Sequence, residues 1–269
     1  MVLSPKAEKF ANAAENVTAG SEFVVRAMTY NIHSCVNTYR EVNPYTVARI
    51  IKALEADVVA LQEVDAEKND GDNHNQAKTI AERLNMNYVF FPVEDNGLHA
   101  FGLAVLSRFP IGEYSFTRLP SHYATLIPRK RGAIRATIHT PAGPIHLFNT
   151  HLSVYKGEQR KQMKVLLDTE WLSSIMDNQP AIFCGDLNAG SLSRTYRRVA
   201  NYLTDVQKAL DDPWLPRPTF HARSPFLRID HMFISRHFTP LKVEVTINPD
   251  TRTASDHLPL IAELTMNGK

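Results

Sequence analysis

Short apolar runs, separated by polar turns and amphipathic segments, cover most of the chain. Runs of this length that are bounded by turn residues predict buried β-strands. The expected strands are residues 23–32, 58–61, 87–93, 101–111, 131–140, 145–153, 181–184, 229–235, 241–247 and 257–264. The proline- and glycine-containing turn at 141–144 joins two of these strands into a hairpin.

Helical periodicity is clearest after Asn43, where Pro44 starts a segment with apolar residues at Val47, Ile50 and Ile51. Proline fits the first helical position, and this apolar spacing is typical of an amphipathic helix. Further helices are expected at residues 6–17, 76–84 and 158–176, and loops at 67–75 and 213–225. The strand at 58–61 is expected to end in Gln62 and Glu63.

The elements follow one another in a mixed order, because strands arrive singly, in hairpins and after helices. A doubly wound sheet would need a more regular alternation, so the order favours an α/β protein with twisted sheets packed face to face and helices outside. No solenoid repeat, low-complexity segment or linker divides the sequence. We expect an N-terminal helical segment at residues 1–22 and a single domain over residues 23–269.

The composition is that of an ordinary globular protein with a large core, since 43% of the 269 residues are hydrophobic and 22% are charged. The formal net charge is +2 and the sequence pI is about 8.5. This basic excess is too small to argue for a nucleic-acid partner by itself. Any cationic surface must therefore be local.

The two cysteines, Cys35 and Cys184, lie in or beside apolar runs and have no pairing pattern. This indicates a reducing compartment or a protein indifferent to redox conditions. The first twenty residues contain no apolar stretch typical of a signal peptide or a membrane span. We therefore expect a cytoplasmic, monomeric protein without a transmembrane segment.

Polar residues of a few kinds recur where the predicted strands end or begin. They are Asn31, Glu63, Asn149, His151, Asp186, Asn188, Asp256 and His257. Each alone has a structural explanation, because Asn and Asp form turns and a single histidine is usually packed or solvated. Their recurrence at strand ends instead indicates a common functional site.

Carboxylate and amide oxygens in this set suit Mg²⁺, with Mn²⁺ as the alternative, whereas Zn²⁺ prefers histidine and cysteine. Phosphoester hydrolysis needs a hard cation, a carboxylate that orients water, and imidazole and amide donors for the transition state. The segment "AIFCGDLNAGSLS" at 181–193 carries two of these groups, Asp186 and Asn188, on the same side of an extended chain. Gly185 is expected to allow a close backbone approach there.

Six segments resemble motifs of the endonuclease/exonuclease/phosphatase superfamily, which includes deoxyribonuclease I and exonuclease III. They are "TYNIH" at 29–33, "LQEVD" at 61–65, "NTHLS" at 149–153, "GDLNAG" at 185–190, "RIDHMFIS" at 228–235 and "SDHLPL" at 255–260. They occur in the order found in that superfamily and span nearly the whole chain. The resemblance implies a four-layer α/β sandwich, with two mixed sheets between outer helices and the site at one edge.

The resemblance also implies roles for the matched residues. Glu63 is expected to be the principal metal ligand, with Asn31 close to the metal and Asp256 a ligand or a neighbour of one. Arg131 is the candidate for a direct contact with the substrate phosphate, since arginine matches phosphate oxygens. A solvated loop explains the cluster of Arg131 with residues 129 and 130 equally well.

Five matched residues are implied to act on the phosphate and the attacking water. Asp186 orients or deprotonates the water, and Asn188 holds Asp186 and the phosphate. His151 donates to a phosphoryl oxygen. His257 contacts the phosphate as a donor or acid, oriented by Asp230, because a carboxylate fixes the tautomer of a histidine.

The catalytic residues do not select the substrate, because specificity lies in the loops. Basic stretches at 129–135 and 193–200 could bind a nucleic-acid strand such as DNA, or the second could merely cover a helix face. A phosphodiesterase of the nuclease type is the preferred interpretation. A phosphatase or a lipid hydrolase of the sphingomyelinase type is the alternative within the enzyme class. The sequence argues against a catalytically silent binding module, because every matched motif retains its reactive residue.

Overall fold

The computed structural model describes residues 23–69, 72–121, 130–168, 171–172, 178–210, 212, 214 and 216–267. The helix expected at 6–17, and with it the N-terminal segment 1–22, lies outside the described residues. Everything below refers to the described part of the chain.

Two mixed β-sheets form the centre of the protein. The first contains, in spatial order, β12 (Phe238–Val245), β13 (Leu260–Met266), β1 (Val24–Asn31), β2 (Val58–Asn69), β5 (His99–Ser107) and β4 (Asn87–Asp95), with β3 (Asp72–Asn75) paired to β2. The second contains β10 (Thr204–Asp205), β11 (Asp230–Ile234), β9 (Ala181–Asp186), β8 (Gly143–His151), β7 (Arg131–Thr140) and β6 (Ile111–Leu119). Each sheet has one parallel pair, β1 with β2 and β8 with β9.

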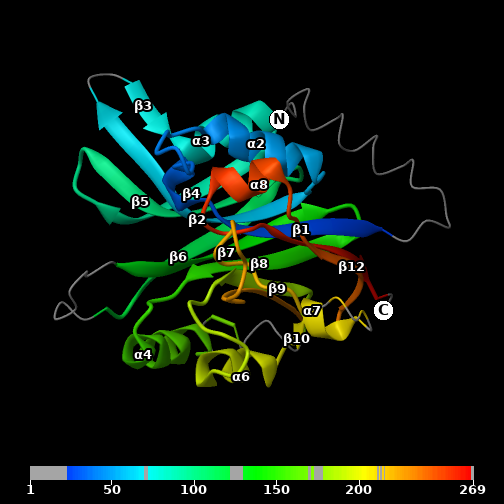
Figure 1. Ribbon diagram of the computed structural model, residues 1–269. Coiled ribbons are helices and arrows are strands. Elements are labelled where there is room, and N and C mark those ends of the chain that lie inside the picture. Colours follow the sequence, from blue (N-terminus) through cyan, green and yellow to red (C-terminus); the bar gives the residue numbers. More distant parts are fainter. Residues whose placement is uncertain are drawn as a thin grey trace, which may run out of the picture.

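Helices cover the outer face of each sheet, so the protein has four layers (Figure 1). The helices on the first sheet are α2 (Pro44–Ala53), α3 (Gln76–Leu84) and α8 (Pro249–Ala254). Those on the second are α4 (Lys156–Leu166) and α6 (Arg194–Ala200), while α7 (Val206–Ala209) and the 3₁₀ turn η1 (His33–Cys35) are short connecting pieces. The predicted four-layer α/β sandwich is confirmed.

Three apolar clusters hold these layers together, one between the sheets and one under each helical layer. Strand β9 illustrates the alternation, because Ile182 and Cys184 face the core between the sheets while Phe183 packs under α4 and α6. Successive side chains of a strand point to opposite faces, so one short strand serves two cores.

Several predicted elements agree with the structure. Helix α2 begins at Pro44, and the Asn43 side chain accepts a hydrogen bond from the Thr46 amide as its N-cap. Helix α3 covers residues 76–84 as expected, and β7 and β8 form the predicted hairpin.

Several boundaries were predicted wrongly. The helix expected at 158–176 is observed as α4, which ends at Leu166, and the Leu172 amide donates to the Leu166 carbonyl oxygen while its side chain is buried in the core under α4. Residues 169–170 and 173–176 of the expected helix lie outside the described residues. The loop expected at 67–75 is a hairpin of β2 and β3, whose backbone pairing does not need apolar side chains. The strand expected at 101–111 ends at Ser107, and β6 follows as a separate strand.

The strand that was expected to end at Glu63 continues to Asn69. Its pairing with β5 shifts between Gln62 and Val64, and Glu63 has a left-handed backbone with φ of 55°. Glu63 is therefore the extra residue of a β-bulge, which redirects one side chain without ending the strand.

Candidate active site

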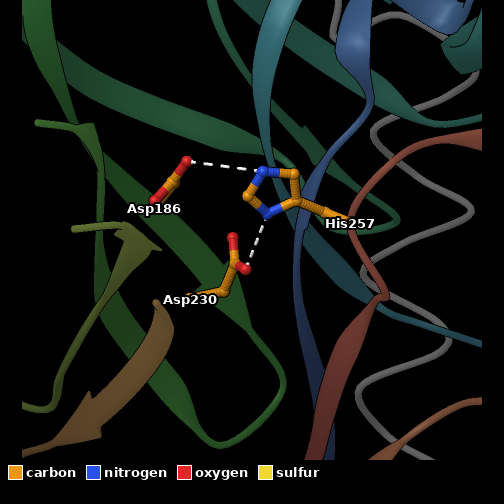
Figure 2. A group of neighbouring side chains, drawn as sticks. All are labelled: Asp186, Asp230 and His257. Carbon is orange, nitrogen blue, oxygen red and sulfur yellow. Dashed lines mark hydrogen bonds and ion pairs between the residues drawn. The ribbon is translucent and has the colours of Figure 1, made fainter. Parts of the chain in front are cut away.

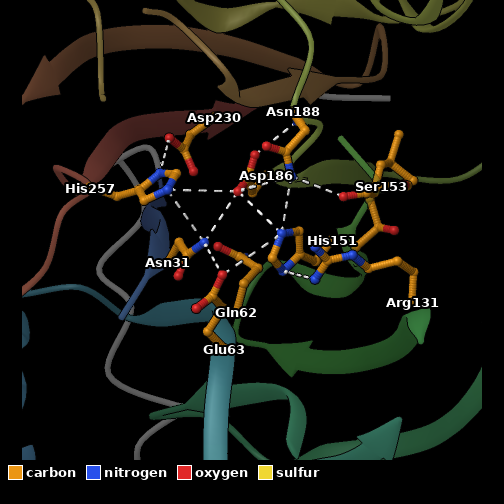
Figure 3. A network of polar contacts seen from close by, with 12 residues as sticks. Asn31, Gln62, Glu63, Arg131, His151, Ser153, Asp186, Asn188, Asp230 and His257 are labelled. Atoms are coloured by element: carbon orange, nitrogen blue, oxygen red, sulfur yellow. Dashed lines mark hydrogen bonds and ion pairs between the residues drawn. The ribbon is translucent and has the colours of Figure 1, made fainter. Parts of the chain in front are cut away.

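The predicted site residues meet at one edge of the two sheets, where both parallel strand pairs end (Figure 3). In the first sheet Asn31 pairs with Gln62, the neighbour of Glu63. In the second sheet His151 pairs with Asp186. Since parallel strands end at the same edge, this register places the reactive side chains together.

Gly185 sets the distance between β8 and β9 at this edge. It has φ of 139°, and a Cβ atom built on it would lie 1.9 Å from the carbonyl oxygen of Thr150. No residue with a side chain fits such a position without a shift of the backbone. The predicted close approach at Gly185 is confirmed, and it brings Asp186 beside His151.

The carboxylate of Asp186 lies at the centre of the network. Its Oδ1 atom accepts a hydrogen bond from the Asn188 amide at 2.8 Å, and its Oδ2 atom accepts one from Asn31 Nδ2 at 3.1 Å. The side chain is almost fully buried. Burial and the nearby Asp230 raise the pKa of Asp186 to about 7, against the opposing effect of His257.

Asn188 follows Asp186 in a left-handed conformation with φ of 48°, which asparagine tolerates better than most residues. Its Nδ2 atom donates to the carbonyl oxygen of Leu152 at 2.9 Å and lies 3.1 Å from His151 Nε2. Through the backbone amide and the side chain of Asn188, the turn after β9 therefore connects Asp186 to the end of β8.

His257 and Asp230 form the predicted pair, with 2.8 Å between Nδ1 and Oδ2 (Figure 2). Thr219 Oγ1 donates to the same Oδ2 atom at 2.6 Å, and His257 Nε2 lies 3.8 Å from Asp186 Oδ2. Burial alone would lower the pKa of His257, but the charge and hydrogen bond of Asp230 raise it to about 10. The ring is thus a cation that faces Asp186.

Glu63 and Asp256 lie on the more open side of the network, with His33 between them. The His33 Nδ1 atom is 3.6 Å from Glu63 Oε2 and 3.5 Å from Asp256 Oδ1, and Asn31 Nδ2 donates to Glu63 Oε1 at 3.3 Å. Burial would raise the pKa of Glu63, but the bond with His33 and the nearby His151 hold it well below its ordinary range. Glu63 is therefore a carboxylate anion at neutral pH.

Arg131 lies beside His151, with 3.2 Å between its Nη1 atom and the Nδ1 atom of the ring. A guanidinium can only donate, so Nδ1 accepts its hydrogen bond. The Nε2 atom of the ring lies 3.3 Å from Asp186 Oδ2. Arg131 is buried, and its predicted contact with the substrate phosphate stays a prediction. Residue 129 lies outside the described residues.

His33 and Gln62 were not among the predicted site residues, and Asn149 was expected at the site without an assigned role. His33 lies in the "TYNIH" segment that carried the resemblance, and Gln62 precedes Glu63. Gln62 Nε2 donates to Asn149 Oδ1 at 2.7 Å, and Asn149 Nδ2 donates to the carbonyl oxygens of Leu61 and Ala104. This buried amide pair joins β2 to β8 directly behind the site.

Two groups of side chains have the chemistry to hold a metal ion. Among the described residues, Asp186, Asp230 and His257 bring one ligand atom each within 4.8 Å of one another. The ring of His257 is cationic, however, and a protonated imidazole nitrogen has no lone pair for a metal. Glu63 and Asp256 offer partly exposed carboxylate oxygens, which are the ligands that Mg²⁺ prefers.

Fold and site together define a hydrolase of phosphoesters. Residues 28–257 match the Endonuclease/Exonuclease/phosphatase family, and the chain belongs to this family. The superfamily resemblance carried by the six motifs is thereby confirmed.

Known relatives cover nearly the whole chain. The protein YbhP of Escherichia coli K12 is 26% identical over 261 residues, which are 90% of this chain and 97% of YbhP. A structure described as an endonuclease/exonuclease/phosphatase from Beutenbergia cavernae has a TM-score of 0.77 and 25% identity, covering 91% of this chain and 72% of that one. A mannosyl-6-phosphatase from Bacteroides thetaiotaomicron has a TM-score of 0.70 at 18% identity, covering 90% and 100% respectively, and shares the fold.

No helix in the described part of the chain is both long enough and apolar enough to cross a membrane.

Proposed function

We propose that this protein is a divalent-metal-dependent phosphodiesterase in which Asp186 directs a water molecule at the phosphorus atom. The observation that carries the proposal is the environment of Asp186, a buried carboxylate held by Asn188 and Asn31 and flanked by two histidines. A pKa near the operating pH suits a general base, and burial gives Asp186 such a pKa of about 7.

The other side chains act on the phosphoryl oxygens. His257, held by Asp230, donates from Nε2, and His151 donates from the nitrogen opposite its contact with Arg131. The backbone amide of Asn188 fixes the direction of the Asp186 carboxylate, and its side-chain amide lies beside His151 Nε2, next to the position of the phosphoryl oxygens in this scheme. Donors that are fixed in advance by such contacts stabilise developing charge without reorganisation. Arg131 is a positioning residue in this scheme.

Mg²⁺, or Mn²⁺ in its place, fits the donor set of Glu63 and Asp256 with Asn31 close by. The fit rests on oxygen chemistry, because Glu63 is anionic and the Nδ1 atom of His33 lies 3.5 to 3.6 Å from an oxygen of each carboxylate. The hydrogen bond with Glu63, and to a smaller extent the charge of Asp256, raise the pKa of His33. A bound divalent ion would supply neutralisation of the phosphate charge. The three residues would hold the ion at the open side of the network.

Nucleic acid is one candidate substrate, and the exposed arginines of α6 favour it. Arg194, Arg197 and Arg198 follow the catalytic turn directly. The other basic stretch supports nucleic acid less, since Arg131 is buried against His151 and the Arg135 guanidinium lies over Trp171. A lipid or small-molecule phosphoester is the second candidate, supported by the groove described below. The cytoplasmic location and the monomeric state stay predictions.

The test is hydrolysis of bis(p-nitrophenyl) phosphate, a small phosphodiester, by the full chain with Mg²⁺. We expect Asp186→Asn, Glu63→Ala and His257→Ala each to lower kcat by about 100-fold or more. Circular dichroism and thermal unfolding should show that the variants remain folded. Unchanged turnover in the folded variants would contradict the proposed mechanism.

A further inference from the structure

A groove of about 1050 Å³ opens beside the catalytic turn and, apart from Asn188, is lined by residues outside the catalytic network. It lies between α4, α6 and the segment before β11, and Asn188 contributes to its wall. Concave sites of this size accept one ligand of moderate size. Because Asn188 belongs to both the groove and the catalytic network, a phosphoester held at Asp186 would extend into this groove.

The rim of the groove exposes large apolar side chains. Leu192 is 84% exposed, Phe226 is 68% exposed and Val154 is 59% exposed. Apolar side chains that gather around a hollow and are edged by polar residues mark an interaction site, whereas scattered ones do not. Phe226 also lies against Phe220, whose ring is 4.9 Å from that of His257. The apolar rim is therefore continuous with the catalytic histidine.

Cations line the same groove. They are Lys156 and Arg160 of α4 and Arg194 and Arg198 of α6. The ion pairs found among the described residues include no carboxylate partner for any of these four. Arg228, which also lines the groove, is instead neutralised by Asp205. An overall charge of only +2 thus hides a local positive surface next to the site.

The chemistry of the rim distinguishes between two anionic substrates. A strand of nucleic acid binds by stacking successive bases on aromatic rings, and the groove offers one exposed ring, Phe226. Aliphatic side chains such as Val154 and Leu192 do not stack, but they bind hydrocarbon. Cations beside exposed apolar residues are the combination that binds anionic lipid.

We propose that this groove binds the hydrocarbon chain of a phospholipid whose phosphodiester is then hydrolysed at Asp186, while the cations of the groove contact the phosphates of neighbouring anionic lipids. This inference rests on the proposed function and specifies its substrate class. In the reaction the water oxygen forms a bond to phosphorus, the ester P–O bond breaks, and the alcohol leaves with a proton that the water provided. Arg160 and Arg194 contact the phosphates of neighbouring lipids, and Leu192 and Phe226 hold the chain.

The first experiment measures binding without catalysis. The full chain is sedimented with vesicles of phosphatidylcholine alone or mixed with phosphatidylglycerol, in the presence of EDTA. We expect cosedimentation with the anionic vesicles, and about ten-fold weaker binding for the double variants Leu192→Ser/Phe226→Ser and Arg160→Gln/Arg194→Gln. All four positions are exposed, so folding is not at risk. Leu241→Ser and Lys242→Gln, exposed on β12, are the matched controls and should bind normally.

The second experiment compares kcat/KM for phosphatidylglycerol in mixed micelles with kcat/KM for bis(p-nitrophenyl) phosphate. We expect this ratio to fall about ten-fold in both groove variants and to stay constant in the controls. An oligothymidylate is tested in parallel. Faster cleavage of the oligonucleotide, with the same dependence on the groove variants, would assign the groove to nucleic acid and overturn the lipid proposal.

The outcomes separate the two proposals. Hydrolysis of the small phosphodiester without binding or hydrolysis of phosphatidylglycerol overturns the groove assignment and leaves the proposed function standing. Vesicle binding that depends on the groove, without hydrolysis of any phosphodiester, supports the groove assignment and contradicts the proposed function. Binding that both double variants retain overturns the groove assignment.

Discussion

Replacing Gly185 with alanine tests how the two strands that carry Asp186 and His151 are brought together. The new Cβ atom would lie 1.9 Å from the Thr150 carbonyl oxygen, where ordinary contacts are 3.4 Å or longer, so β8 and β9 must move apart. The φ of 139° adds backbone strain of about 1–3 kcal/mol. Relief of the clash costs about a further 1–3 kcal/mol. We expect the free energy of unfolding to fall by about 4 kcal/mol.

Gly143→Ala is the matched control for this prediction. Gly143 has a similar φ of 121°, but nothing lies within 4 Å of its added Cβ atom, so only the backbone strain applies. Urea unfolding of both variants, followed by circular dichroism, gives the difference that the close approach alone causes. Equal destabilisation of the two variants would refute the argument. Any folded Gly185→Ala protein should also lose turnover, because Asp186 and His151 are 3.3 Å apart only in the native register.

Three further predictions concern the site. Asp230→Asn removes a charge-assisted hydrogen bond to His257 that is worth about 1.5–3 kcal/mol, so kcat should fall about 10- to 150-fold with little change in KM. The exposed Asp250→Asn is the control. An unchanged kcat in Asp230→Asn would contradict the role of the pair. EDTA should abolish hydrolysis and Mg²⁺ should restore it. Glu63→Gln should raise the Mg²⁺ concentration that gives the half-maximal rate by about ten-fold or more. A wild-type Mg²⁺ titration curve for this variant would show that Glu63 is not a metal ligand. Arg131→Gln should lower kcat about ten-fold, because the His151 ring loses the guanidinium that donates to it. Arg135→Gln is the control and should retain the wild-type kcat. Equal kcat values for the two variants would exclude a positioning role for Arg131.

The sequence was sufficient to predict which residues gather at the site. Glu63, Asp186 and His257 lie far apart in the chain, and only the order of the six motifs related them. The structure brings all three into one network with Asn31 and His151. The change from apolar to polar residues is local, so a sequence indicates where a strand reaches such a site, although the strand ends expected at Glu63 and at residue 111 were wrong.

The exact setting of the site was not predictable in the same way. The bulge at Glu63 was interpreted as a strand end, since a single left-handed residue leaves no signature in a hydrophobic pattern. Gln62 and Asn149 form their bond across two sheets, and nothing local marks such a contact. His33 owes its position to three successive left-handed residues, His33 to Cys35, which propensity arguments do not anticipate.

The position of His257 beside an interior strand has a consequence for truncated chains. His257 closely precedes β13, and β13 lies between β12 and β1. A chain cut before residue 256 would therefore lack the histidine that we propose as a phosphate donor, and it would leave one side of β1 unpaired. Completion of the proposed site and completion of the first sheet are thus the same folding event.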